Sequence, residues 1–269
     1  MHKQLVGQPS IRARHSRAGD ALIYWALVRS AIWSHFARVW LRVEGPIPTP
    51  ASGPLIFYLN HPSWWDGYMA HVLNRMVLGN RFQAFCMMDE RELQRYRFFT
   101  WIGAFSVNRQ DARSALSSVA YISRLLAARP DRALAIFPQG EITPNDRRPL
   151  QTFSGMAHVV QRAGGATLWP VALRYEFRGQ QRPEAFIRAG PAHYAPAAID
   201  TRALTVAAGA RLTAACDALR DDVNGAQLED YRVLLRGRPG PDAIFDAARA
   251  LLPGRVGQRY RQKRRERQE

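Results

Sequence analysis

Short apolar runs that alternate with helical stretches constrain the fold of this chain more than any other feature of its sequence. Runs rich in β-branched and aromatic residues, as in buried strands, lie at 54–60, 101–109, 133–140, 166–175 and 185–190. Helical patterns lie at 114–128, 153–164, 202–224 and 241–252, and a helical stretch is also expected between the first two strands. This alternation predicts an α/β fold with a mostly parallel central sheet flanked by helices.

An N-terminal helical segment is expected at 21–40, before the first of these strands. It has the length of a membrane span, but Arg29, His35 and Arg38 interrupt its apolar sequence. At helical spacing, one side of it gathers large apolar residues: Leu22, Trp25, Trp33, Phe36 and Trp40. Because Trp and Arg tolerate the headgroup boundary, we expect a helix that lies in the membrane interface. The alternative is an ordinary helix whose apolar side faces the protein core.

A Pro- and Gly-rich segment at 45–54 separates this helix from the first strand. We therefore expect a basic N-terminus with the interfacial helix at 1–44, an α/β domain at 45–252 and a basic, flexible tail at 253–269. The first twenty residues are polar and basic and lack the apolar core of a secretory leader, so secretion is not expected.

The balance of charged residues favours anionic partners. Lys and Arg total 38 against 22 Asp and Glu, which gives a formal net charge of +16. Such a field attracts nucleic acid, anionic lipid headgroups and acidic carriers alike, so a basic protein that binds nucleic acid without catalysis stays an alternative. Cys86 and Cys216 are isolated from each other and from histidines at ligand spacing, so neither a metal site nor a disulfide is expected.

The block NHPSWWD at 60–66 carries the strongest chemical signal. The first strand delivers His61 to a loop, and Asp66 follows five residues later. An imidazole can take a proton from an alcohol, and a carboxylate on its other nitrogen fixes the tautomer and stabilises the imidazolium. The end of a parallel strand is also where α/β folds bind their ligands. Taken alone, the pair would be better explained by a structural histidine.

Three further blocks follow in the sequence: GAFSVNR at 103–109, FPQGE at 137–141 and WPVAL at 169–173. In order and spacing, the four blocks resemble the signature of the glycerolipid acyltransferase family, typified by 1-acylglycerol-3-phosphate acyltransferases. That family has NHxxxxD, then G-x-[IF]-x-[VI]-x-R, then FPEG-[TS]-R and a strand with a VP-type block. The resemblance covers roughly residues 40–195, and the ordered set is far more specific than any block alone.

The resemblance implies direct transfer of a fatty acyl group from acyl-CoA or acyl carrier protein to a lipid or glycolipid hydroxyl, as in phospholipid biosynthesis. It implies that His61 is the general base and Asp66 its partner, while Arg109 binds the phosphate of the acceptor. The chain has no Gly-x-Ser-x-Gly elbow to offer another nucleophile, and the acyl thioester is a co-substrate, so no cofactor is expected. The residues expected to bind substrate are Asn60, Arg109, Phe137, Pro138, Gln139, Gly140 and Glu141.

Together with the interfacial helix, the resemblance implies a peripheral, monotopic enzyme on the anionic membrane surface, at the cytoplasmic face of the inner membrane. No specific nucleic acid is expected as a partner. A thioester or ester hydrolase that uses the same His61 and Asp66 with water as the acceptor is the alternative within catalysis.

The third block departs from the family pattern. Gln139 replaces the family's glutamate, and Glu141 and Ile142 replace its Thr-Arg pair. Loss of the arginine removes a phosphate-binding charge, and the new carboxylate opposes a phosphate. The departure favours a neutral hydroxyl acceptor, unless Arg147 and Arg148 in the next loop replace the missing charge.

Overall fold

The computed structural model describes residues 7–179, 181–238 and 240 of the chain. Within this part, one mixed sheet has the strand order β4-β3-β5-β2-β6-β7-β1-β9, and β8 pairs with β6 off this path. Its strands are β1 (Arg38–Val43), β2 (Leu55–Leu59), β3 (Gln83–Asp89), β4 (Ala104–Val107), β5 (Arg132–Ile136), β6 (Gly165–Glu176), β7 (Glu184–Ala189), β8 (His193–Pro196) and β9 (Arg232–Arg236).

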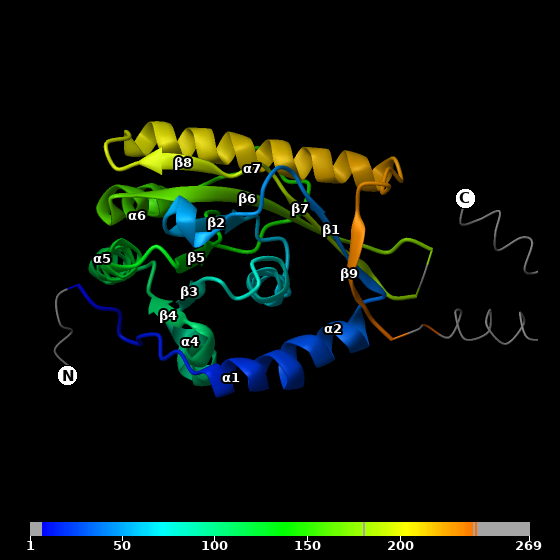
Figure 1. The fold of residues 1–269 in the computed structure, drawn as a ribbon, viewed down its shortest axis with the longest axis horizontal. Coiled ribbons are helices and arrows are strands. Elements are labelled where there is room, and N and C mark those ends of the chain that lie inside the picture. The colour runs from blue at the N-terminus through cyan, green and yellow to red at the C-terminus, as the bar shows by residue number, and fades with distance from the viewer. Residues whose placement is uncertain (1–6, 180, 239, 241–269) are drawn as a thin grey trace, which may run out of the picture.

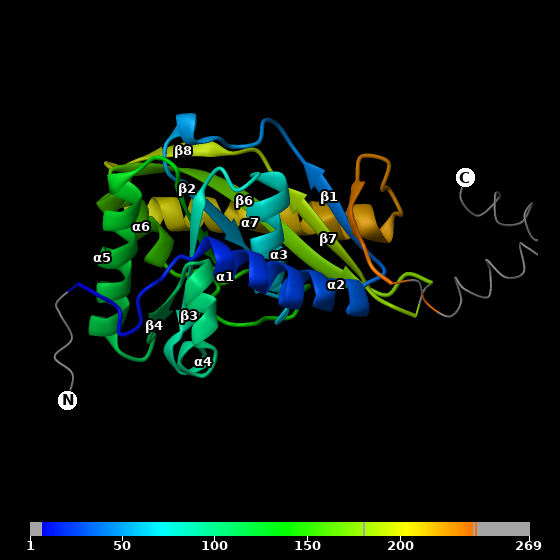
Figure 2. The ribbon, with the colours of Figure 1, turned by 60° about the horizontal axis from the view of Figure 1, so that its bottom comes forward.

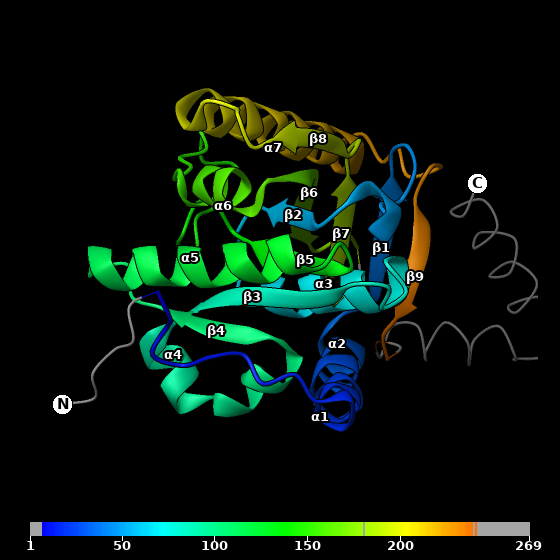
Figure 3. The ribbon, with the colours of Figure 1, turned by 60° about the vertical axis from the view of Figure 1, so that its left-hand side comes forward.

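The helices lie on both faces of this sheet (Figure 1 and Figure 3). They are α1 (Arg17–Leu22), η1 (Ile23–Arg29), α2 (Ser30–His35), η2 (Pro50–Ser52), α3 (Asp66–Val72), η3 (Leu73–Val77), α4 (Glu90–Arg95), η4 (Arg97–Ile102), α5 (Ala112–Ala128), α6 (Gly155–Ala163) and α7 (Thr201–Asn224). Strands β1 to β7 pair in parallel except for the β6–β7 pair, and β8 and β9 add antiparallel edges. The predicted α/β class with a mostly parallel sheet is confirmed.

Alternate residues of the central strand β2 fill two separate cores, as the pleat of a strand requires. Leu55, Phe57 and Leu59 pack on the face that carries α3 and the N-terminal helices. Ile56 and Tyr58 pack on the opposite face, under α5, α6 and α7. Both faces of β2 are therefore buried, which explains its uninterrupted apolar sequence.

The first three helical elements form one continuous helix from Arg17 to His35, here called the N-terminal helix. It buries one side against the sheet face that carries α3, through Ile23, Tyr24, Val28 and Ile32. Its other side leaves Leu22, Trp25 and Trp33 58%, 62% and 46% exposed. One side of the helix therefore belongs to the core, as in the alternative expectation, and the other side is an exposed apolar surface. Among the residues that the structure describes, no helix is both long and apolar enough to cross a bilayer.

The helix prediction for 21–40 was wrong at its C-terminal end. The chain turns extended at Phe36, and residues 38–43 form β1, which pairs with β7 and β9. Trp40 therefore lies in a strand, where its indole donates to Glu184. The sheet thus draws on residues from both sides of the boundary expected at residue 44. The tail at 253–269 and the helix expected at 241–252 lie outside the described residues.

Besides β1, three more strands were not predicted, and the strand expected at 101–109 is shorter. Residues 83–89 form β3 within a stretch expected to be helical, because pairing with β4 and β5 overrides the helix preference of its Gln, Ala and Met residues. The expected strand at 101–109 begins only at Ala104, because the chain first turns at Gly103 with a left-handed φ of +96°. The short edge strands β8 and β9 have no apolar alternation strong enough to predict them.

Candidate active site

Two neighbouring parallel strands bring the first and third sequence blocks together. Strands β2 and β5 pair with Tyr58 opposite Ile136, so the loops that follow them leave the sheet side by side. The rings of His61 and Phe137 stack with centroids 4.4 Å apart. The His61 side chain is 22% exposed, so it is reachable from solvent. The carboxyl end of the sheet thus holds a histidine on an aromatic support.

The Asp66 carboxylate lies behind this histidine, at the first position of α3. Its Oδ2 lies 2.7 Å from His61 Nδ1, and the carboxylate is fully buried. An ionised carboxylate only accepts hydrogen bonds, so Nδ1 carries the proton and Nε2 is left as the basic nitrogen. The sequence prediction paired these two residues, and the structure brings them into direct contact.

Three donors surround the Asp66 carboxylate. Besides His61, the Ser63 backbone N–H donates to Oδ2 at 2.8 Å and the Tyr175 hydroxyl donates to Oδ1 at 2.6 Å. Burial raises the pKa of the Asp66 carboxyl, while the bonds from His61, Tyr175 and Ser63 oppose that change. Burial, and then the Asp66 carboxylate beside it, hold the pKa of Tyr175 well above its usual value. The phenol therefore stays a donor throughout the physiological pH range.

Tyr175 was not predicted from the sequence as a residue of the site. The residue lies on β6, 109 positions beyond Asp66, and only the pairing of β2 with β6 brings it to the site. Its position at the end of a predicted apolar strand gave no chemical signal. A tyrosine in such a run is explained well enough by packing.

The Asn60 side chain makes its hydrogen bonds within the protein. Its side-chain amide donates to the Leu173 carbonyl at 2.9 Å and accepts from the Leu173 N–H at 2.7 Å. The side chain therefore continues the pairing of β2 with β6 one residue past the end of β2. It fixes the backbone immediately before His61, although the resemblance placed Asn60 among the substrate-binding residues.

Hydrogen bonds of Gln139 connect the loop after β2 with the loop after β5. Its side-chain oxygen accepts from the His61 backbone N–H at 2.8 Å, and its amide nitrogen donates to the Thr143 hydroxyl. The Thr143 N–H in turn donates to the His61 carbonyl at 2.8 Å. Gln139 accepts a hydrogen bond from one partner and donates one to the other. A carboxylate at this position could only accept hydrogen bonds, so it could not donate to Thr143. Pro138, between Phe137 and Gln139, is buried.

Arg109 and Gly140 bring the second and third blocks into contact. A Cβ at Gly140 would lie 2.6 Å from Arg109 Nη1, and Gly140 has a left-handed φ of +70°. Only glycine therefore allows the guanidinium this close to the turn. Arg109 also lines a cavity of about 480 Å³ with Asp89 and Glu90, and it makes no ion pair with any described residue.

The side chains that replace the family's Thr-Arg pair face solvent. Glu141 is exposed and Ile142 is 53% exposed. Arg148, a candidate replacement cation, instead donates to Asp217 at 3.0 and 2.6 Å. Its charge is therefore neutralised within the protein, and Arg147 stays exposed in the same loop.

The described residues bear on metal binding and cysteine chemistry through their placement and burial. They contain no group of three or more His, Cys, Asp or Glu side chains placed to hold a metal ion. Burial raises the pKa of both Cys86 and Cys216 to about 12, so both remain thiols near neutral pH. Neither cysteine is therefore poised as a nucleophile.

The chain is similar to known proteins in two comparisons. One solved structure, the 1-acyl-sn-glycerophosphate (LPA) acyltransferase PlsC from Thermotoga maritima, is similar with 15% sequence identity and a TM-score of 0.49, over 75% of this chain and 76% of that one. No curated protein sequence matches the chain. Residues 40–174 match the sequence model of the family described as Acyltransferase. Since this segment makes up half of the chain and holds all four sequence blocks, the protein belongs to the acyltransferase family.

Proposed function

We propose that this enzyme moves a fatty acyl group from a thioester donor, acyl-CoA or acyl carrier protein, to a hydroxyl of a lipid or glycolipid. The observation that carries the proposal is the His61–Asp66 contact, with the carboxylate buried and held by two further donors. Such a carboxylate fixes the ring and stabilises the imidazolium that forms in the reaction.

The reaction needs one base and no covalent enzyme intermediate. His61 Nε2 takes the proton of the acceptor hydroxyl while the hydroxyl oxygen attacks the thioester carbonyl carbon. The tetrahedral intermediate collapses with cleavage of the C–S bond, and the leaving thiolate takes the proton back from the imidazolium. The histidine ends in its starting state, and an ester and a free thiol are the products.

The acceptor that fits best carries a neutral hydroxyl. Arg109 supplies one cation beside the Gly140 turn, while Glu141 follows that turn with a negative charge and Ile142 brings none. A phosphate monoester carries close to two negative charges, and it would meet one attractive and one repulsive group. A sugar or alcohol hydroxyl would avoid this conflict.

The exposed side of the N-terminal helix is the proposed contact with the membrane. Leu22, Trp25 and Trp33 present large apolar and interfacial side chains to solvent on one side of a helix whose other side is anchored in the core. With a net charge of +16, the protein would bind peripherally to an anionic surface, at the cytoplasmic face of the inner membrane.

The test is a transfer assay with purified full-length protein. Labelled acyl-CoA or acyl carrier protein is offered with neutral glycolipid, monoacylglycerol or lysophosphatidic acid, and both thioester consumption and the acylated product are followed. His61→Ala should abolish transfer, and His158→Ala, on α6, should not. Free fatty acid in place of an acylated lipid would identify a hydrolase, and transfer by His61→Ala at the wild-type rate would refute the proposal.

A further inference from the structure

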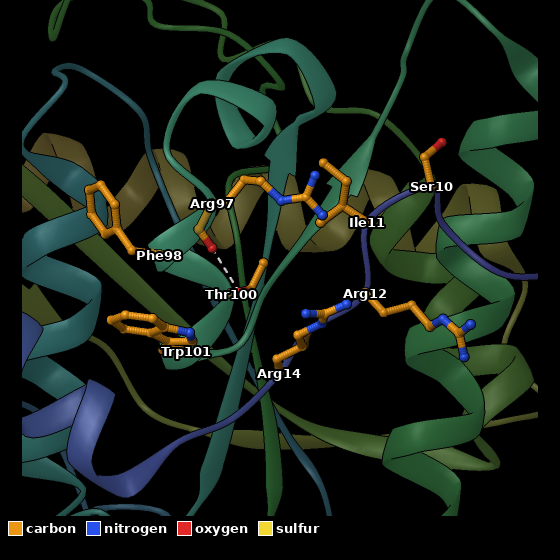
Figure 4. A pocket seen from close by; sticks show the side chains of 9 residues that line it. Ser10, Ile11, Arg12, Arg14, Arg97, Phe98, Thr100 and Trp101 are labelled. Atoms are coloured by element: carbon orange, nitrogen blue, oxygen red, sulfur yellow. Dashed lines mark hydrogen bonds between the residues drawn. The ribbon is translucent and has the colours of Figure 1, made fainter.

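A second cavity, of about 470 Å³, lies outside the candidate active site (Figure 4). One wall is the extended segment 10–14 and the other is η4. The side chains that give it chemical character are Arg12, Arg14, Arg97, Phe98 and Trp101. We call it the arginine cavity. Its volume suits a ligand of the size of a phospholipid headgroup.

The backbone around the arginine cavity is held in place by hydrogen bonds. The N–H of Arg14 donates to the Thr100 carbonyl at 2.9 Å, and the N–H of Ser16 donates to the Trp101 carbonyl at 3.1 Å. Farther along, Ile11 exchanges hydrogen bonds of 2.9 Å with the backbone N–H and the hydroxyl of Ser106. The segment thus runs along the outer edge of β4, and these hydrogen bonds hold the backbone that carries its arginines.

The three arginines have no counter-ion among the residues that the structure describes. Arg12, Arg14 and Arg97 are exposed and form no ion pair with any described residue, whereas Arg75, Arg148 and other arginines are paired. Three cations around one cavity repel one another, and a bound anion would remove that cost. The planar guanidinium is the group best suited to a phosphate.

The position of the arginine cavity points to a lipid. Trp101, 39% exposed, packs on Gly19 at the start of the N-terminal helix, where an added Cβ would meet it at 2.8 Å. From there the exposed side chains Leu22, Trp25 and Trp33 follow the helix to its other end. At that end, the ring centroids of His35 and Trp65 lie 5.1 Å apart. Trp65 belongs to the segment 60–65 between β2 and α3, here called the catalytic loop because it holds His61, and its neighbour Trp64 is 58% exposed.

The cavity and the catalytic loop therefore lie at opposite ends of the N-terminal helix, which crosses the face shown in Figure 2. At 1.5 Å of rise per residue, the span from Gly19 to His35 is roughly 25 Å. A headgroup bound in the cavity would thus be remote from His61 and would not be the acceptor of the reaction.

We propose that the arginine cavity binds the phosphate of an anionic phospholipid, which anchors the enzyme at the end of the N-terminal helix remote from the catalytic loop. This inference rests on the proposed membrane contact, and it adds a specific headgroup site to it. The guanidinium groups of Arg14 and Arg97, which extend into the space between segment 10–14 and η4 (Figure 4), hold the phosphate, while Trp101 and Phe98 lie at the headgroup boundary. Two points of attachment, the cavity and the exposed helix side, would fix how the catalytic loop faces the bilayer.

The experiment compares vesicle binding of full-length variants that lose the same charge. Arg14→Gln with Arg97→Gln removes two cavity arginines, and Arg162→Gln with Arg202→Gln removes two exposed arginines from α6 and α7, on the other face of the sheet. Vesicles of phosphatidylcholine alone, or with phosphatidylglycerol, are sedimented with each protein. We expect the cavity variant to lose about tenfold or more in affinity for the anionic vesicles, and the control variant about threefold or less.

Several results would overturn the proposal. Equal losses in the two double variants would mean that only the net charge matters, and equal binding to neutral and anionic vesicles would exclude headgroup recognition. A cavity variant that binds vesicles normally but loses affinity for free CoA, inorganic phosphate or an acidic carrier protein would assign the cavity to that ligand instead. The binding assay requires no turnover, so its failure leaves acyl transfer untouched, and His61→Ala should bind vesicles as the wild type does.

Discussion

The Tyr175 hydroxyl donates a hydrogen bond of 2.6 Å to Asp66 Oδ1, so a strand residue 109 positions away holds the carboxylate that orients the candidate base. Tyr175 is itself packed near Phe36, just past the end of the N-terminal helix, with ring centroids 5.8 Å apart. The geometry of the site therefore depends on three distant parts of the chain.

Replacement of Tyr175 by Phe should lower kcat about tenfold, with a smaller change in KM. A hydrogen bond to a charged group contributes about 1.5–3 kcal/mol, and its loss leaves Asp66 less firmly oriented. The measurement is steady-state transfer, with Tyr194→Phe, a 60% exposed tyrosine, as the control. If Tyr175 acts through Asp66, its replacement should have little further effect in an Asp66→Asn background. Full additivity of the two changes would contradict this role.

Loss of the proposed catalytic pair, His61 and Asp66, should remove most of the activity. General-base catalysis contributes about 10²–10⁴-fold, so His61→Ala should lower kcat by at least the lower bound. Asp66→Asn should lower it by a similar factor, because an amide no longer selects the tautomer with a basic Nε2. Circular dichroism should show that both variants stay folded. A folded His61→Ala enzyme with near wild-type turnover would show that another residue is the base.

Asp66→Asn should also reveal a conflict between stability and function. Burial raises the pKa of the Asp66 carboxyl above 3.8, so at pH values between 3.8 and the raised pKa the folded state binds more protons than the unfolded state. The stabilisation from this group is present below pH 3.8 and is lost as the pH rises through the folded pKa. Urea unfolding should therefore show Asp66→Asn gaining stability relative to wild type as the pH rises from 3.5 to 7.

The opposite trend with pH would mean that the hydrogen bonds from His61, Ser63 and Tyr175 outweigh burial. The carboxylate would then stabilise the fold and its pKa would be lowered. The comparison isolates one group because every other carboxylate is present in both proteins.

The acceptor can be tested by restoring the charges of the third block. Glu141→Thr with Ile142→Arg should raise the activity toward lysophosphatidic acid relative to wild type, while the activity toward a neutral acceptor falls or stays the same. Arg148→Ala should leave the acceptor preference unchanged, because Arg148 is already paired with Asp217. Efficient acylation of lysophosphatidic acid by wild type, lost in Arg147→Ala or Arg148→Ala, would show that the loop supplies the missing charge.

The exposed side of the N-terminal helix should govern membrane association. Trp25→Gln with Trp33→Gln should shift the protein from the membrane fraction to the supernatant at moderate salt, with an unchanged unfolding temperature, because both side chains are largely exposed. Leu116→Gln, at a 55% exposed position on α5, controls for loss of apolar surface elsewhere. A full-length protein that neither high salt nor carbonate extracts would require a different mode of attachment.

The sequence predicted the parts of the site that lie within single loops. His61 and Asp66 are five residues apart, and the strand before them is buried on both faces, so local pattern was enough. Tyr175 and the contact of Arg109 with Gly140 depend on which strands become neighbours, and a local pattern holds no information on that. The strand β3 was missed for the same reason, since its residues become a strand only by pairing on both edges.

The N-terminal helix was difficult to predict for a different reason. Its apolar residues lie on more than one side of the helix. Val28 and Ile32 pack in the core, whereas Trp25 and Trp33 are exposed. Helical periodicity identifies an apolar side of the helix, but it does not tell whether that side contacts the core or the membrane. The structure assigns one side to the core and exposes the other.

This double use of the N-terminal helix means that the proposed anchor cannot be cut away to prepare a more tractable enzyme. Truncation before residue 41 would remove Val28, Ile32, Phe36 and Val39, all at most 1% exposed, and would take away the first half of β1, which pairs with β7 on one side and β9 on the other. Such a fragment would lose core packing worth several kcal/mol, about the whole margin by which a domain is folded. The proposed attachment to a bilayer and the folding of the domain therefore depend on the same nineteen residues, Arg17 to His35.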